Sequence, residues 1–270
     1  MLDKISTNFA YLNPVDTTFE TTNSTSVRNN TVNNGLKHDS FERNPFENKS
    51  FKVQEVQTPV QYYGLSPKIL LRVFLDTDFI NNLVEKNPEV KNILQEHNVE
   101  YELHPENVKS IINSHLSTTT AYALKIANKL NLSVADKKVL EMASTFHDFG
   151  KIFIPDEILN KMGRLTAEEK EIMKLHAELG YQVLLPSGIN KRVLNLIRDH
   201  HSTQNSDELL TQILSVADIY SALKEERCYK KPMSDAEAFK ILDQKAQKGE
   251  VSAEVVNALK SAIYKEECVA

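Results

Sequence analysis

The chain has 270 residues, of which 41% are hydrophobic and 26% are charged, a composition typical of a globular protein with a packed core. Its formal net charge of −5 argues against a domain that wraps nucleic acid, because such domains usually present a dominant basic face. Two cysteines, Cys228 and Cys268, are too few for a disulfide framework and fit a reducing compartment.

The first 50 residues are unusually polar, since Asn, Ser and Thr make up 21 of them. Such a segment buries too little apolar surface to offset the entropy that ordering would cost. We therefore expect residues 1–58 to form a disordered polar tail. This N-terminus also lacks the apolar core of a signal peptide, and the apolar stretch 69–75 is interrupted by Arg72 and too short to span a bilayer. The expected location is the cytoplasm, without membrane contact.

A helical period begins near Ser66. Apolar residues then recur at spacings of three and four: Ile69, Leu70, Val73, Phe74, Phe79, Ile80, Leu83, Val90, Ile93 and Leu94. Residues 59–103 are therefore predicted to be either a helical lead-in to the main domain or a small N-terminal module. The spacing does not distinguish the two.

One long helix is predicted next, over residues 105–130. Pro105 suits a first helical turn, and the apolar period continues through Ile111. His115 lies four residues after Ile111 and so extends the same apolar stripe.

Capping signals divide the rest of the chain into further helices. Thr166 with Glu169 and Ser234 with Glu237 match the capping box, in which each side chain satisfies a backbone N–H of the first turn. The predicted helices cover residues 134–147, 166–185, 190–201, 208–225, 234–247 and 252–265. No segment alternates polar and apolar residues over the length of a strand, so the predicted fold class is all-α with no sheet.

Seven potential metal ligands fall on or beside the apolar faces of these helices: His115, His147, Asp148, His176, His200, His201 and Asp218. A lone histidine in such a place is usually a hydrogen-bonded core residue. Buried aspartates, however, are costly unless a cation or partner compensates them. Five imidazoles and two carboxylates suit Zn, Mn, Fe or Co and are too many for one ion. We expect two divalent transition-metal ions that share a carboxylate; the alternative is a purely structural polar core.

These motifs occur in a distinctive order, in which HDFGK carries His147 and Asp148, His115 lies upstream, and Asp218 stands in a Val-Ala-Asp context. This order resembles the HD superfamily of metal-dependent phosphohydrolases. The segments HDFGKIFIPDEILNKMGRLTAEEKEIMKLHAELGYQVL, RDHH and SVADIYSALKEERCYKKPMS more narrowly resemble the HD-GYP branch, which hydrolyses cyclic di-GMP. The resemblance covers residues 113–264 and implies an HD-domain-like helical bundle, which we place at residues 104–270.

The resemblance also implies roles for individual residues. One metal ion would be held by His115, His147, Asp148 and Asp218, and the second by Asp148, which bridges, with His176, His200 and His201. A hydroxide between the two ions would attack phosphorus. Asp148 and Lys151 would be catalytic, and Lys151 would bind a substrate phosphate. Arg227 and Lys230 resemble the phosphate-binding basic pair of the family; the alternative is a solvated basic turn.

The chain departs from the family pattern after His201. The family continues with a glutamate and a Gly-Tyr-Pro loop, whereas this chain reads STQNSDELLTQ. Because that loop lines the mouth of the pocket and contacts partners, its loss points to a changed substrate or partner. Some members hold a third metal with a glutamate one turn before the first histidine. Ile111 occupies that position here, which favours two metals.

The implied function is a phosphodiesterase that opens a cyclic dinucleotide, with cyclic di-GMP as the first candidate. Two alternatives stay open: an HD-type phosphohydrolase of another nucleotide or an alarmone, and a non-catalytic signalling module that keeps the metal pocket. The complete ligand set favours an enzyme. The expected partners are a small nucleotide substrate and a bacterial signalling protein, with no nucleic acid and no membrane.

Overall fold

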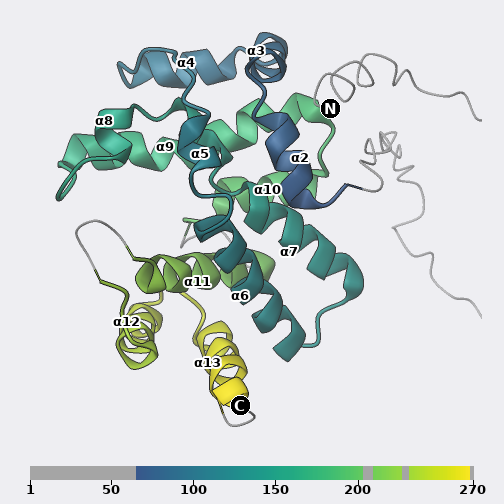
Figure 1. Cartoon of the computed structure of the whole chain (residues 1–270), viewed down its shortest axis with the longest axis vertical. Coiled ribbons are helices and arrows are strands. Elements are labelled where there is room, and N and C mark those ends of the chain that lie inside the picture. Colours follow the sequence, from purple (N-terminus) through teal and green to yellow (C-terminus); the bar gives the residue numbers. More distant parts are fainter. Residues whose placement is uncertain (1–64, 203–208, 227–230, 268–270) are drawn as a thin grey trace, which may run out of the picture. The chain divides into compact units, whose positions relative to one another are not determined.

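The computed structural model describes residues 65–202, 209–226 and 231–267, which all belong to one compact unit (Figure 1). The predicted tail, residues 1–58, lies outside the described residues, and so do Arg227 and Lys230. Within the described ranges the chain forms helices joined by turns, with no strand. The predicted all-α class is confirmed.

The helices follow one another with short connections. In chain order they are α2 (Pro67–Phe74), α3 (Thr77–Lys86), α4 (Glu89–Glu96), α5 (Glu106–Lys109), α6 (His115–Lys129), α7 (Val134–Phe146), the 3-10 helix η2 (Phe149–Phe153), α8 (Asp156–Leu159), α9 (Ala167–Leu184), the 3-10 turn η3 (Leu185–Ser187), α10 (Lys191–Asp199), α11 (Leu209–Lys224), α12 (Asp235–Gln247) and α13 (Ala253–Glu267). From α7 onward, each helix predicted from the sequence is present with ends within two residues of the expected ones.

The predicted capping boxes explain two of these boundaries. The Thr166 and Ser234 side chains each accept a hydrogen bond from the backbone N–H three residues later, and the Glu169 and Glu237 carboxylates accept from the N-cap N–H in return. Both boxes are confirmed. Each satisfies donors at a helix start that would otherwise lack an intrahelical partner.

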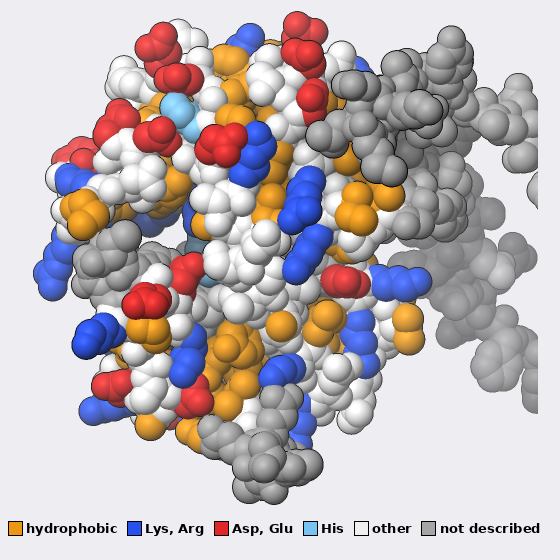
Figure 2. All heavy atoms as spheres, in the orientation of Figure 1, with side chains coloured by type: hydrophobic (Ala, Val, Ile, Leu, Met, Phe, Trp, Pro, Cys, Tyr) orange, Lys and Arg blue, Asp and Glu red, His pale blue; other side chains and the backbone are white. Residues whose placement is uncertain are grey.

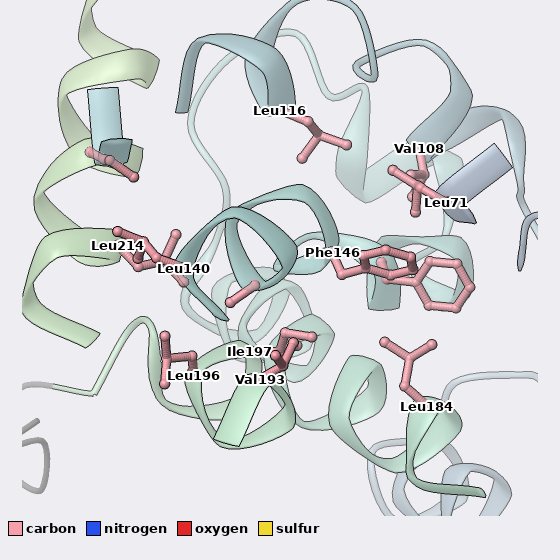
Figure 3. Close-up of a cluster of buried hydrophobic side chains, with 14 of the residues drawn as sticks. Leu71, Val108, Leu116, Leu140, Phe146, Leu184, Val193, Leu196, Ile197 and Leu214 are labelled. Carbon is pink, nitrogen blue, oxygen red and sulfur yellow. The ribbon is translucent and has the colours of Figure 1, made fainter. Parts of the chain in front are cut away.

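The core lies between α6, α7, α9, α10 and α11. Helix α6 packs along both α7 and α11, and α10 packs against α7 and α9. Figure 3 shows the side chains that fill the space between them, each at most 3% exposed: Leu116, Leu140, Phe146, Val193, Leu196, Ile197 and Leu214. Burial of each such side chain contributes about 1.5–3 kcal/mol, so this core holds the helix ends that carry the site in place.

Helices α2, α3 and α4 share this core. Helix α2 packs on α7, while α3 and α4 pack on α9 (Figure 1). Phe74 is fully buried and meets Phe146 edge to face, with ring centroids 5.6 Å apart. The apolar period at the start of the described chain therefore packs on the same helices that carry the candidate site.

The predicted continuous helix over residues 105–130 is wrong in its first part. Helix α5 ends at Lys109 and α6 begins at His115. Between them Ser114 adopts φ −109° and ψ −94°, outside the helical region. His115 therefore starts a new helix and does not extend the stripe that contains Ile111.

Tertiary hydrogen bonds account for this break. The Asn107 amide donates to the backbone carbonyls of Lys151 and Ile154, at 3.1 Å each, and the backbone N–H of His104 donates to the carbonyl of Ile152 at 2.7 Å. These bonds tie α5 and the segment before it to η2. A period of apolar residues carries no information about such distant partners, so the sequence pattern predicted one helix where there are two.

The surface carries charges of both signs. On the face shown in Figure 2, acidic and basic side chains are interspersed among apolar and uncharged ones. None of the described helices combines the length and apolar character needed to cross a membrane.

Candidate metal centre

All seven predicted ligands meet at one site in the helical bundle, mostly at helix ends. They are His115, the first residue of α6; His147, the C-cap of α7; Asp148, which precedes η2; His176 within α9; His200, the C-cap of α10, and His201 after it; and Asp218 within α11. Helix ends from different parts of the sequence are thus directed at one point.

One part of the cluster, here named the carboxylate half, consists of His115, His147, Asp148 and Asp218. The Nε2 atom of His115 lies 2.9 Å from Asp218 Oδ1 and 3.7 Å from Asp148 Oδ2. The Nε2 atom of His147 lies 3.6 Å and 3.5 Å from the same two oxygens. Imidazole nitrogens and carboxylate oxygens at these separations can share one cation between them.

The other part, the imidazole half, consists of His176, His200 and His201. The Nε2 atom of His176 lies 3.3 Å from His200 Nε2 and 3.2 Å from His201 Nε2. His176 and His200 are buried, whereas His201 is exposed. Three imidazole nitrogens that face one another form a set of neutral donors suited to a transition-metal ion.

Asp148 lies between the two halves. Its Oδ1 atom is 3.4 Å from His176 Nε2, whereas its Oδ2 atom faces His115 and His147. The Lys151 ammonium, one turn further on, is 2.7 Å from the same Oδ2. This carboxylate thus offers one oxygen to each half.

Three of the histidines are oriented by their own helices. The Nδ1 atoms of His147, His176 and His200 lie 2.8, 2.6 and 2.6 Å from the backbone carbonyl three residues earlier. A carbonyl can only accept, so each Nδ1 carries the proton and each Nε2 presents a lone pair to the centre. These rings are held in the tautomer that binds metal.

The surroundings shift the pKa values of the ligands in different directions. Burial lowers the pKa of His176 to about 3 and that of His200 well below its ordinary value. Burial also acts on His147, but Asp148 and Asp218 outweigh it and raise the pKa. Burial alone would raise the pKa of both aspartates. For Asp148, the positive charge of Lys151 and the nearby imidazoles outweigh burial and lower the pKa well below its usual range. For Asp218, His115 and His147 do the same.

One buried nitrogen shows that the donor set fits a cation. His147 is 0% exposed, and its Nε2 atom has no hydrogen-bond partner in the described structure. A buried polar atom without a partner costs about 1–3 kcal/mol. A metal ion coordinated by this nitrogen together with neighbouring carboxylate oxygens would remove that cost.

A close approach of η2 to α9 sets the position of Asp148. A Cβ atom on Gly150 would lie 2.0 Å from the backbone oxygen of His176 and 2.6 Å from the backbone nitrogen of Gly180. Only glycine allows the two backbones this close. In the sequence Gly150 stands only as part of the HDFGK motif, and its position two residues after Asp148 was the signal for this close approach.

Sequence reasoning also missed two hydroxyl side chains beside His115, namely Thr118 and Ser221. Each lies one helical turn after a predicted ligand, Thr118 after His115 and Ser221 after Asp218. This spacing places them on the same helix faces as the ligands and was the signal that could have found them.

Comparison with known proteins agrees with this geometry. The chain is 36% identical over 120 residues to the cyclic di-GMP phosphodiesterase response regulator RpfG of Xanthomonas campestris, covering 39% of this chain and 31% of that protein. It is 31% identical over 151 residues to the 3'3'-cGAMP-specific phosphodiesterase 2 of Vibrio cholerae, covering 50% of this chain and 28% of that protein. The chain therefore matches about a third of the length of these relatives.

A solved structure and a family model complete the comparison. The HDG"Y"P protein Bd1817 from Bdellovibrio bacteriovorus shares the fold, with a TM-score of 0.50 and 17% identity over 73% of this chain and 69% of that one. Residues 90–255 match the family model described as the HD domain, which includes all seven clustered ligands. The chain belongs to the HD domain family.

Proposed function

We propose that this protein is a metal-dependent phosphodiesterase that hydrolyses a cyclic dinucleotide, with cyclic di-GMP as the first candidate substrate. The observation that carries the proposal is the position of Asp148, which offers one carboxylate oxygen to each half of a seven-ligand centre. Membership of the HD domain family supports it, as do the names of the relatives, which are phosphodiesterases of cyclic di-GMP and 3'3'-cGAMP.

The ligand arrangement favours two divalent ions, one per half, and Asp148 would help to hold both. When bound, such ions lower the pKa of a water molecule and neutralise negative charge on phosphoryl oxygens. The chain prepares the site for them, because Asp148 stays ionised at neutral pH and the low pKa values of His176 and His200 keep these rings neutral, with Nε2 free of a proton.

Lys151 is the candidate phosphate-binding residue among the described side chains. Its ammonium lies at Asp148 and is 20% exposed, so it stands at the edge of the centre and within reach of solvent. A substrate phosphate that approached the centre from solvent would meet this positive charge. Arg227 and Lys230 remain predicted phosphate contacts. We also propose a signalling protein as partner and the cytoplasm as location.

The proposal is tested by metal analysis combined with a substrate screen. The full chain, purified without chelators and in the absence of oxygen, is loaded in turn with Mn, Fe, Zn and Co. We expect about two ions per chain, as the number of donors implies. The loaded protein is then incubated with cyclic di-GMP, 3'3'-cGAMP, cyclic di-AMP, linear dinucleotides and guanosine tetraphosphate, and the products are separated by chromatography.

Opening of a cyclic dinucleotide that stops when a chelator removes the metals would support the proposal. Hydrolysis of guanosine tetraphosphate alone would favour the alarmone alternative. Full metal occupancy without turnover of any of these substrates would favour the binding module, and failure to bind any of the four metals would overturn the enzyme hypothesis.

A further inference from the structure

His115 differs from the other buried histidines of the centre in how its ring is supported. His147, His176 and His200 use the carbonyl three residues earlier, but His115 begins α6 and follows a non-helical turn. The carbonyl three residues before it, that of Ile112, accepts a hydrogen bond from the Ser117 hydroxyl at 2.8 Å. His115 therefore lacks the local partner that orients the other three rings.

A hydroxyl pair from two helices replaces that partner. The Ser221 Oγ atom, on α11, lies 3.3 Å from His115 Nδ1 and 2.5 Å from the Thr118 Oγ1 atom on α6. Thr118 in turn lies 3.0 Å from the backbone carbonyl of His115, to which it donates. A chain of hydrogen bonds can thus run from His115 Nδ1–H to Ser221, from Ser221 to Thr118, and from Thr118 to a carbonyl.

The hydroxyl pair has a property that a carbonyl lacks, since a hydroxyl both donates and accepts. When the chain of bonds runs from His115 Nδ1–H outward, the Nε2 lone pair faces the centre and can bind metal. When it runs in the opposite direction, Nδ1 accepts from Ser221 and Nε2–H donates to Asp218 Oδ1, which lies 2.9 Å away. The pair therefore supports His115 both with and without a metal ion.

We propose that Ser221, supported by Thr118, positions His115 and sets the affinity of the carboxylate half for its metal ion. This inference rests on the proposed metal centre. Loss of a hydrogen-bond partner behind a ligating histidine typically costs 10–100-fold in metal affinity. The imidazole half does not use this pair, so the effect should fall on one of the two ions.

Ser221→Ala is the direct test, with metal binding as the readout. Competition with a chelator of known affinity should show one ion held as in the wild-type protein and one held roughly 10–100-fold more weakly. In the cobalt-loaded protein, the visible absorption of one site should change and that of the other should not. Circular dichroism shows whether the variant is folded.

Three further variants separate positioning from general destabilisation. Ser221→Thr keeps the hydroxyl and should restore the affinity, because Ser221 borders a pocket of about 300 Å³ that can accept a methyl group. Ser187→Ala removes another buried serine hydroxyl, in η3, and should bind metals like the wild type. Thr118→Val alters an exposed position, so it should fold even if Ser221→Ala does not, and it should weaken the same ion.

Wild-type affinity for both ions in Ser221→Ala and Thr118→Val would overturn the inference while leaving the proposed function intact. Equal weakening of both ions would overturn it too, because the pair would then act on the whole fold. If the wild-type protein itself binds no metal, the proposed function fails first, and this result is distinct from either of the others.

Discussion

The two halves of the metal centre place their histidines in opposite chemical settings. In the carboxylate half, the Nε2 atoms of His115 and His147 face aspartate oxygens, whereas in the imidazole half three ring nitrogens face one another. Carboxylates raise the pKa of His147, while burial lowers those of His176 and His200.

This difference indicates that the two halves contribute different properties to metal binding: one supplies negative charge, and the other supplies imidazoles that are neutral at neutral pH. The carboxylate half supplies the negative charge that offsets a cation, but the raised pKa of His147 means that this ring holds a proton more firmly, and a proton competes with a metal for the same nitrogen. The imidazole half supplies no charge of its own, but the low pKa values of His176 and His200 make these rings neutral at neutral pH, so no second proton has to leave before a metal binds. Asp148 joins the two, since each half faces one of its oxygens.

The largest expected effect comes from removal of the shared carboxylate. Asp148→Asn should reduce the occupancy of both ions and abolish essentially all turnover of cyclic di-GMP, because both halves lose an anionic oxygen. Asp218→Asn should mainly weaken the ion of the carboxylate half, since Asp218 lies against His115 and His147. Elemental analysis and steady-state kinetics on both variants check this. Two ions and normal turnover in Asp148→Asn would remove the basis for a shared carboxylate.

A smaller effect is expected from removal of the Lys151 side chain. Its ammonium contacts Asp148, but a protonated amine cannot bind a metal ion. Lys151→Ala should keep both ions but lose about 2–4 kcal/mol of transition-state stabilisation, or about 30- to 1,000-fold in rate, as for deletion of one charge-stabilising donor. The matched control is Lys161→Ala, which breaks only a surface pair with Glu169. Equal rates for the two variants would show that Lys151 does not bind the substrate.

The smallest effect concerns the stability of the metal-free protein. The unfolded chain protonates His176 and His200 as the pH falls below about 6.5, but the folded chain does so only at much lower pH. The unfolded state then binds more protons, so acidification should lower the free energy of unfolding. His147 acts in the opposite sense, because its raised pKa contributes stability at low pH that is lost as the pH rises through that pKa.

Because the lowered pKa values of His176, His200 and His201 oppose the raised pKa of His147 alone, a net fall in Tm is expected between pH ~7 and pH ~4.5. Thermal unfolding followed by circular dichroism in the presence of a chelator measures this. His176→Asn should make the dependence on pH shallower. A Tm that rises on acidification would mean that the carboxylate half dominates the proton balance.

Much of the fold could be predicted from local sequence signals. Capping residues such as Thr166 and Ser234 satisfy backbone groups of their own helix, so their effect does not depend on distant partners. The apolar period likewise reports which face of a helix is buried, and it placed His147 and His176 on buried faces, where the structure has them. Residue types alone pointed to a metal centre, since buried aspartates are costly unless a cation or another partner compensates them.

The sequence by itself thus determined the all-helical class, most helix boundaries, the HD family resemblance and the set of candidate ligands. Only the tertiary structure decided that α5 and α6 are separate, that Gly150 lies against Gly180, and that Ser221 supports His115. The physical reason is the distance along the chain over which each kind of interaction acts. Caps and periodicity act within a few residues of one helix, whereas these features depend on atoms that are 30 to 106 positions apart in the chain and meet only when the helices pack.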